Sequence, residues 1–261
     1  MSKKKNNFRK GGNLQRTNQQ RGKTKKDLKE TSIFDKCAEG IFLLLAFFFN
    51  LISYYKSGFN KKTSMNVFKV LLKKGPYGEF SLYRKIRKTF GKENIFVNLY
   101  VPNQNTDYTE VDLVAVSKNQ IFVFEVKNFS GLIYGSQQDK MWTQFLNKNS
   151  KFPFYNPLRQ NYAHTEALKK TLNLKQDVFQ PLVVFSNRSK LQKITVNENN
   201  EIFTFKTIKR KLKKEIKNST LEPFEDRVKI LIALNRLTKV SEEIKEKHIE
   251  QVKEISLKKA T

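Results

Sequence analysis

The chain has 261 residues, 38% of them hydrophobic, which is enough to bury the core of one medium-sized domain with appendages. Its 51 Lys and Arg against 24 Asp and Glu give a net charge of +27, which attracts nucleic acid or an anionic membrane surface without choosing between them. One cysteine and two histidines exclude a disulfide framework and a Cys-rich zinc site, and leave little material for a Ser-His-Asp triad. Carboxylates must therefore carry any metal chemistry.

Two N-terminal segments differ sharply in composition. Residues 1–32 are rich in Lys, Arg, Asn, Gln and Gly with almost no apolar content, which predicts a disordered basic tail. Residues 33–58 contain the charge-free run 40–55, whose helix would span roughly 24 Å, less than a bilayer core. Because the neighbouring sequence cannot cover an apolar helix, we predict a single membrane anchor with Tyr54 and Tyr55 at the interface; a core helix is the alternative.

The location follows from the same segment. Basic residues crowd both flanks of the apolar run, so the positive-inside rule is indecisive, although the density of the tail favours a cytoplasmic N-terminus. We therefore expect a membrane-associated protein whose remaining residues are cytoplasmic. We expect no small-molecule cofactor, and the oligomeric state stays open.

From about Met65 the pattern changes to mixed α and β, which predicts one domain over residues 65–206, followed by Lys/Glu-rich helices over 207–261. Apolar residues at helical spacing indicate an amphipathic helix that ends at Gly91: Phe80, Tyr83, Ile86 and Phe90. The other predicted elements are strands at 94–102, 110–117 and 120–129, a helix from Pro157 to about Leu172, and strands at 181–187 and 193–196.

The strand at residues 120–129 contains two charged side chains, Glu125 and Lys127, in an otherwise apolar run. Burying an unpaired charge costs several kcal/mol or shifts its pKa, so such residues normally have a partner. Because strand side chains alternate, Glu125 and Lys127 share one face with Ile121 and Val123 and emerge side by side.

The neighbouring strand supplies the expected partners. If Lys118-Asn119 is a two-residue hairpin turn, counting back along the ladder sets Asp112 opposite Glu125 and Glu110 opposite Lys127. Opposed residues have Cβ atoms about 5 Å apart, where two carboxylates repel each other. The register therefore predicts a cation between Asp112 and Glu125.

This pattern predicts phosphodiester chemistry. Two carboxylates with waters around an open position suit Mg²⁺ or Mn²⁺, which can activate a water and neutralise charge on a phosphoryl group. Lys127 would hold the attacking water or the phosphate, and Glu79 on the preceding helix would be a further ligand or a water-orienting base. In the alternative, Glu110 and Lys127 form an ordinary cross-strand salt bridge, with Asp112 and Glu125 exposed at the end of the sheet.

Several of these residues occur together in a pattern that resembles a known family. Gly78-Glu79 at a helix start, "TEVDLVAV", "IFVFEVKNFSGLIYG", Trp142 and "NPLRQN" follow one another in the order of the nuclease-related domain (NERD), a branch of the PD-(D/E)-x-K nuclease superfamily. The resemblance covers roughly residues 70–190. It implies an α/β fold with the αβββαβ core of that superfamily, a small mixed sheet flanked by helices, and Mg²⁺-dependent cleavage of DNA.

The resemblance also implies roles for single residues. Asp112 matches the Asp of the family motif, Glu125 and Lys127 match its Glu-x-Lys, and Glu79 matches the helix carboxylate. Gln160 matches a glutamine on the downstream helix. Metal ligation by Asp112, Glu125 and Glu79 is expected on the same basis. The sequence departs from the superfamily name only at the position before Asp112, where the motif has Pro.

Other features have ordinary structural interpretations. A lone Trp142 in an α/β domain is more often a core residue than a base-stacking platform, and His164 is more often a structural histidine than a site residue, although it shares a helix face with Gln160. Asn156-Pro157 indicates a helix start, with Asn as cap. The run "TIKRKLKKEIK" fits a solvated helix face better than a track for a phosphate backbone.

Three hypotheses follow. The first is a membrane-anchored, metal-dependent nuclease that cleaves DNA. The second is a non-catalytic, membrane-associated module that binds nucleic acid and keeps only the fold and the charge. The third is a membrane-surface scaffold with an ordinary salt bridge at the end of a sheet.

Overall fold

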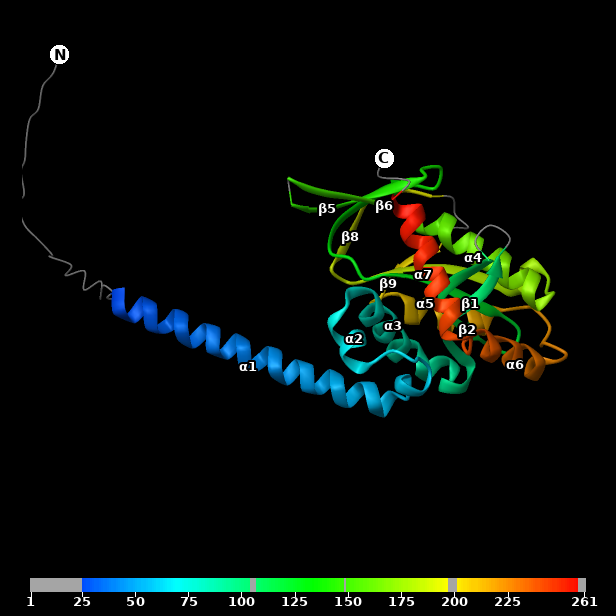
Figure 1. Cartoon of the computed structure of the whole chain (residues 1–261), viewed down its shortest axis with the longest axis horizontal. Helices are drawn as coiled ribbons and strands as arrows, with labels where there is room; N and C mark the ends of the chain where they lie inside the picture. The colour runs from blue at the N-terminus through cyan, green and yellow to red at the C-terminus, as the bar shows by residue number, and fades with distance from the viewer. Residues whose placement is uncertain (1–24, 104–106, 148, 197–200, 258–261) are drawn as a thin grey trace, which may run out of the picture. The chain divides into compact units, whose positions relative to one another are not determined.

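A computed structural model describes residues 25–103, 107–147, 149–196 and 201–257. The α-helices are α1 Lys25–Ser57, α2 Val67–Leu72, α3 Lys74–Phe90, α4 Pro157–Leu172, α5 Ile208–Asn218, α6 Arg227–Leu237 and α7 Glu242–Leu257. The strands are β1 Ile95–Asn103, β2 Asp107–Val116, β3 Ile121–Lys127, β4 Gly131–Ser136, β5 Met141–Asn147, β6 Ser150–Tyr155, β7 Phe179–Phe185, β8 Ser189–Thr195 and β9 Glu201–Thr204. The chain divides into two compact units after Ala46 (Figure 1).

The N-terminal helix is longer than the sequence predicted. Most of the predicted tail lies outside the described residues, but α1 begins at Lys25, so residues 25–32 are helical. By length and composition, Asp35–Ser57 is long and apolar enough to cross a membrane, with a mean hydropathy of 1.8. Of its most apolar stretch, 6% is buried within the structure.

The last turns of α1 belong to the second unit, together with the domain that follows. The side chains of Tyr54 and Phe59 are buried and pack against Phe80 of α3, with ring centroids 5.8 and 5.2 Å away. Arg84 of α3 donates a 2.9 Å hydrogen bond to Asn50. The folded domain therefore includes residues upstream of Met65, where the change in sequence pattern placed its beginning.

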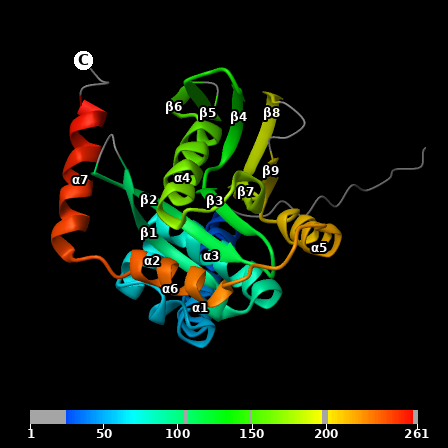
Figure 2. The ribbon, with the colours of Figure 1, turned by 90° about the vertical axis from the view of Figure 1, so that its right-hand side faces the viewer.

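The main sheet has the strand order β1-β2-β3-β7-β9. Strands β1, β2 and β3 are antiparallel neighbours, whereas β3, β7 and β9 run parallel. Helix α3 covers one face and α4 the other (Figure 2). The order α3, β1, β2, β3, α4, β7 is the αβββαβ succession that the resemblance implied, so the predicted fold class is confirmed.

Two apolar clusters lie on opposite faces of this sheet. Phe122, Phe124 and Val126 of β3 pack with α3 and α5, while Ile121 and Val123 pack with α4 and α6. The predicted alternation along β3 is therefore confirmed. Because Glu125 and Lys127 continue the second series, they face the side of the sheet that α4 covers.

A second sheet, with the order β6-β5-β4-β8, is absent from the sequence prediction except for part of β8. It follows β3 in the chain and packs on β7 through Trp142, whose ring is fully buried and stacks on Phe185 at a centroid distance of 6.4 Å. The core interpretation of Trp142 is thus confirmed. Gly135 makes this packing possible, because a Cβ there would lie 2.3 Å from the indole ring.

Candidate active site

The hairpin between β2 and β3 positions the central carboxylates. The backbone amide of Ser117 donates to the Gln120 carbonyl at 2.8 Å, which closes the predicted turn, and the register runs as expected to the pair Leu113–Phe124. Asp112 and Glu125 come next, where the backbone pairing ends. The carboxylate of Asp112 instead accepts a 2.8 Å hydrogen bond from the backbone amide of Val126.

The side-chain alternation breaks at this point in both β1 and β2. Asn98 has a left-handed backbone with φ of 52°, and the β1–β2 pairing skips it together with Asp112, the residue opposite. In β2, Val111 packs on the α4 side and Leu113 on the α3 side, although regular alternation would give them the same face. The break places Asp112 at the end of β3 rather than within a regular ladder.

Glu125 and Lys127 form a buried ion pair on the α4 side. Lys127 Nζ lies 2.6 Å from Glu125 Oε1 and donates a second hydrogen bond, of 3.0 Å, to Gln160 Oε1 on α4. Glu125 is 1% exposed. The structure therefore brings Gln160 to the Glu-x-Lys pair, as the resemblance implied.

His164, predicted as a structural residue, also lies against Glu125. Its Nε2 is 3.2 Å from Glu125 Oε2, and its Nδ1 is 2.9 Å from the hydroxyl of Thr109. The Nε2–Oε2 contact lacks hydrogen-bond geometry, so both atoms are buried without a hydrogen-bond partner among the described residues. The four-residue spacing from Gln160 was the sequence signal that pointed to His164.

Glu79 reaches the edge of this site from α3 and is held by a residue that the sequence analysis missed. The amide nitrogen of Asn98 donates to Glu79 Oε2 at 2.9 Å and to Glu110 Oε1 at 3.1 Å. The prediction that Glu110 opposes Lys127 is wrong, because β2 has parted from β3 there and Glu110 pairs with Tyr100 of β1. The alternative salt bridge between Glu110 and Lys127 is thus not formed.

The carboxyl groups influence one another electrostatically. Burial, with the negative charges of Glu125 and Glu79, holds the pKa of Asp112 well above its usual range. The pKa of Glu79 is raised to about 7, chiefly by burial. The hydrogen bond from Asn98 lowers this pKa, and the negative charges of Glu110 and Glu125 raise it. Burial opposes ionisation of Glu125 too, but Lys127 above all, together with the neighbouring His164, outweighs burial and holds the pKa of Glu125 below the ordinary value.

Lys127 remains a cation for the same reason. Burial alone would lower its pKa, yet Glu125 and Asp112 raise it above the ordinary value of a lysine. The site therefore contains a buried positive charge beside two carboxyl groups, with a third, Glu79, close enough to affect their ionisation.

The described residues fit a divalent cation only in part. They contain no group of three or more His, Cys, Asp and Glu side chains arranged to hold a metal ion. Two carboxylates nevertheless remain for an ion such as Mg²⁺, which commonly binds proteins through one or two carboxylates and completes its shell with water and phosphate. They are Glu125, whose Oε2 has no hydrogen-bond partner among the described residues, and Asp112, whose ionisation Glu125 influences. Glu79 is held by Asn98 instead.

Other predicted features stand where expected. Asn156 caps α4, since its side-chain oxygen accepts a 3.0 Å hydrogen bond from the Leu158 amide. Its amide nitrogen also donates to the carbonyls of Ser136, Gln137 and Asp139, which ties the start of α4 to the second sheet.

The mixed α/β fold is consistent with a nuclease-like protein of the PD-(D/E)-x-K type. Residues 74–186 match the family described as "Nuclease-related domain", so this part of the chain is a NERD domain, and the resemblance seen in the sequence is confirmed. An uncharacterised protein of Bacillus anthracis is 35% identical over 97 residues, which are 37% of this chain and 45% of that protein. The chain thus covers less than half of this curated relative. No solved structure is significantly similar.

Proposed function

We propose that the protein is a metal-dependent nuclease that hydrolyses phosphodiester bonds in DNA. The observation that carries the proposal is the buried group at the end of β3, where Lys127 bridges Glu125 and Gln160 beside Asp112. A salt bridge that served only stability would gain little from such burial, because desolvating both charges offsets their attraction. The match to the nuclease-related family supports the same chemistry.

Each residue of the candidate active site has a distinct proposed role. Asp112 and Glu125 would hold Mg²⁺ or Mn²⁺, which when bound lowers the pKa of a water and neutralises charge on the phosphate. The ammonium of Lys127 would position the attacking water and stabilise negative charge on the phosphoryl oxygens. Gln160 fixes the direction of that ammonium through its 3.0 Å hydrogen bond.

Glu79 and His164 would act around this centre. With a pKa of about 7, Glu79 is suited to accept a proton near neutral pH, so we assign it the role of base or water-orienting group. His164 confines Glu125 from the side opposite Lys127, since it lies 3.2 Å from the other carboxylate oxygen.

The membrane and nucleic-acid partners belong to the same proposal. The exposed apolar side chains of α1, such as Ile41, Phe42 and Leu44, support insertion into a membrane through residues 40–55. The net charge of +27 supports binding to a polyanion, which we propose is DNA. On this proposal the nuclease domain acts next to a membrane.

A metal titration and a cleavage assay test the proposal on the full chain in detergent. We expect Mg²⁺ to raise the melting temperature and to support cutting of plasmid or single-stranded DNA, and we expect Asp112→Asn to abolish both effects. Asp226→Asn, a helix-cap change on α6, is the matched control and should leave the metal response intact. Absence of cleavage with every DNA form and both metals would refute the proposed activity.

A non-catalytic DNA-binding module is the second candidate, because no three-ligand metal cluster exists among the described residues. In that case DNA binding should weaken steeply with salt, while Asp112→Asn should leave both affinity and metal response unchanged. Measuring affinity and melting temperature of the same variant therefore separates the two functions.

A further inference from the structure

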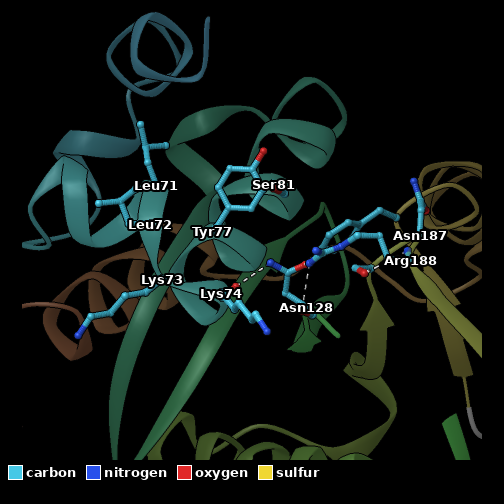
Figure 3. Close-up of a pocket in the computed structure, with 11 residues that line it drawn as sticks. Leu71, Leu72, Lys73, Lys74, Tyr77, Ser81, Asn128, Asn187 and Arg188 are labelled. Atoms are coloured by element: carbon cyan, nitrogen blue, oxygen red, sulfur yellow. Dashed lines mark hydrogen bonds between the residues drawn. The ribbon is translucent and has the colours of Figure 1, made fainter. Parts of the chain in front are cut away.

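A second polar site lies on the other side of the end of β3, away from α4. A cavity of about 390 Å³ opens between the start of α3 and the loops that follow β3 and β7, a size typical of ligand pockets (Figure 3). Residues that directly follow three parallel strands line it: Asn128 after β3, Ser186–Arg188 after β7, and Phe205 just after β9. Ligands of open α/β sheets bind at such carboxyl ends of parallel strands.

Asn128 is the centre of this cavity and adjoins the candidate active site. Its amide nitrogen donates a 2.7 Å hydrogen bond to the Lys74 carbonyl, and its side-chain oxygen accepts a 3.1 Å bond from Arg188 Nη2 (Figure 3). Because Asn128 directly follows Lys127, its Cα lies about 3.8 Å from that of the proposed catalytic lysine. The cavity and the candidate active site are therefore one residue apart along the chain, on opposite faces of the end of β3.

The charge of the cavity is positive and uncompensated. Lys73, Lys74 and Arg188 line it, the lining contains no Asp or Glu, and the described residues form no salt bridge with these three cations. Arg188 is exposed, and in the described part of the chain the hydrogen bonds of its guanidinium go to Asn128 alone. Figure 3 shows Lys74 and Arg188 on either side of Asn128, whereas Lys73 points away from it.

The close packing of α3 against β3 builds this arrangement. A Cβ at Gly78 would lie 2.8 Å from Asn128 Cβ, so only glycine lets the helix approach the strand end this closely. The backbone of Lys74, one turn earlier, then comes within reach of Asn128. Tyr77 and Leu72 give the cavity an apolar wall beside its cations.

We propose that this cavity binds the phosphate of the nucleotide next to the scissile bond, with Arg188 and Lys74 as the phosphate-binding residues. Guanidinium groups bind phosphate through paired hydrogen bonds, and Arg188 has donors left for them beyond its bonds to Asn128. The wall of Tyr77 would lie along the sugar or base. The inference rests on the proposed nucleic-acid function. It places the bound nucleic acid on the side of β3 that faces α3.

Binding without turnover tests the inference separately from catalysis. The full chain in detergent and EDTA is titrated with a short labelled single-stranded oligonucleotide, so that metal and cleavage have no part in the readout. Arg188→Gln should weaken binding by about tenfold or more. It should also reduce the slope of log affinity against log salt concentration by about 1, which corresponds to one lost phosphate contact. Arg236→Gln, an exposed change of the same charge on α6 outside the cavity, should change affinity less than about twofold.

Each other outcome has a definite meaning. Equal losses for the two variants would overturn the inference in favour of diffuse attraction. Competition by inorganic phosphate as strong as by the oligonucleotide would overturn it in favour of a free-anion site. Loss of binding to phosphatidylglycerol vesicles with unchanged oligonucleotide affinity would overturn it in favour of a lipid headgroup. If cleavage is never observed but Arg188→Gln still weakens oligonucleotide binding selectively, the phosphate site at Arg188 and Lys74 stands and the proposed nuclease activity falls.

Discussion

The two sides of the end of β3 use charge in opposite ways. Toward α4, Glu125 is buried and bonded to Lys127, whose side chain is 16% exposed. Toward α3, Lys74 and Arg188 are exposed and have no acidic partner within the described residues. Buried pairs are costly to break and hold a fixed geometry, while exposed cations are available to an incoming polyanion. On the proposed function, the α4 side would perform the chemistry and the α3 side would hold the substrate.

The substitution Lys127→Gln should have the largest effect on cleavage and tests the α4 side of β3 directly. Removing the buried cation takes away the group that stabilises charge on the phosphate, so we expect cleavage to slow by about 10²–10³-fold. Oligonucleotide binding in EDTA should stay within about twofold, because exposed cations carry it. Cleavage rates of Lys118→Gln, in the exposed hairpin turn, provide the control. Unchanged cleavage by Lys127→Gln would remove this lysine from the mechanism.

The second prediction concerns pH and the buried carboxyl of Glu79. Its pKa is about 7 in the folded state against an ordinary 4.5, so the folded protein binds this proton more tightly than the unfolded chain. The corresponding stability is present below about pH 4.5 and is lost as pH rises to about 7, by at most about 3 kcal/mol. Urea unfolding of Glu79→Gln in EDTA should show a flatter dependence over this range. An identical pH profile for variant and wild type would contradict the raised pKa.

The third prediction concerns the close packing of α3 against the end of β3 at Gly78. Gly78→Ala would place a methyl group 2.8 Å from Asn128 Cβ and 3.3 Å from Val126, so we expect a loss of about 1–3 kcal/mol in the free energy of unfolding. Gly75→Ala is the matched control on the same helix. No atom lies within 4 Å of a Cβ there, and alanine favours the helix, so a neutral or slightly stabilising change is expected. Equal effects in urea unfolding would refute the close-packing argument.

The smallest expected effect is at Asn98, which holds Glu79 near the buried site. Asn98→Gly loses the hydrogen bonds to Glu79 and Glu110 but adopts the left-handed backbone without strain. Asn98→Ala loses the same hydrogen bonds and is also strained in that backbone conformation. We expect about 1 kcal/mol of destabilisation for Gly and about 1 kcal/mol more for Ala. The pKa of Glu79 should rise in both variants, because Asn98 lowers it. A pKa of Glu79 that does not move would reduce Asn98 to a turn residue.

The position at which the second unit begins determines which fragment is suitable for solution work. Removing everything before about residue 60 would delete Tyr54 and Phe59, whose rings are buried against Phe80. Large aromatic side chains removed from a core typically cost 3–5 kcal/mol each. A fragment for solution work should therefore begin near Phe47, where the second unit begins.

Much of the fold was predictable because its signals are local. The period of two placed Glu125 and Lys127 on one face of β3, and the two-residue turn set the β2–β3 register as far as Leu113–Phe124. The cap at Asn156 and the Pro after it marked the start of α4 at the correct residue. These features depend on residues that are neighbours in the sequence.

The strands and helices next to β3 and the residue types of the candidate site could thus be predicted from local patterns. Three features became visible only in the folded chain: the break in alternation at Asn98 and Asp112, the position of His164 against Glu125, and the contact between Arg188 and Asn128. They could not be predicted because the residues involved lie far apart along the chain. Asn128 and Arg188 are 60 residues apart, and such contacts come from the packing of whole elements rather than from local periodicity.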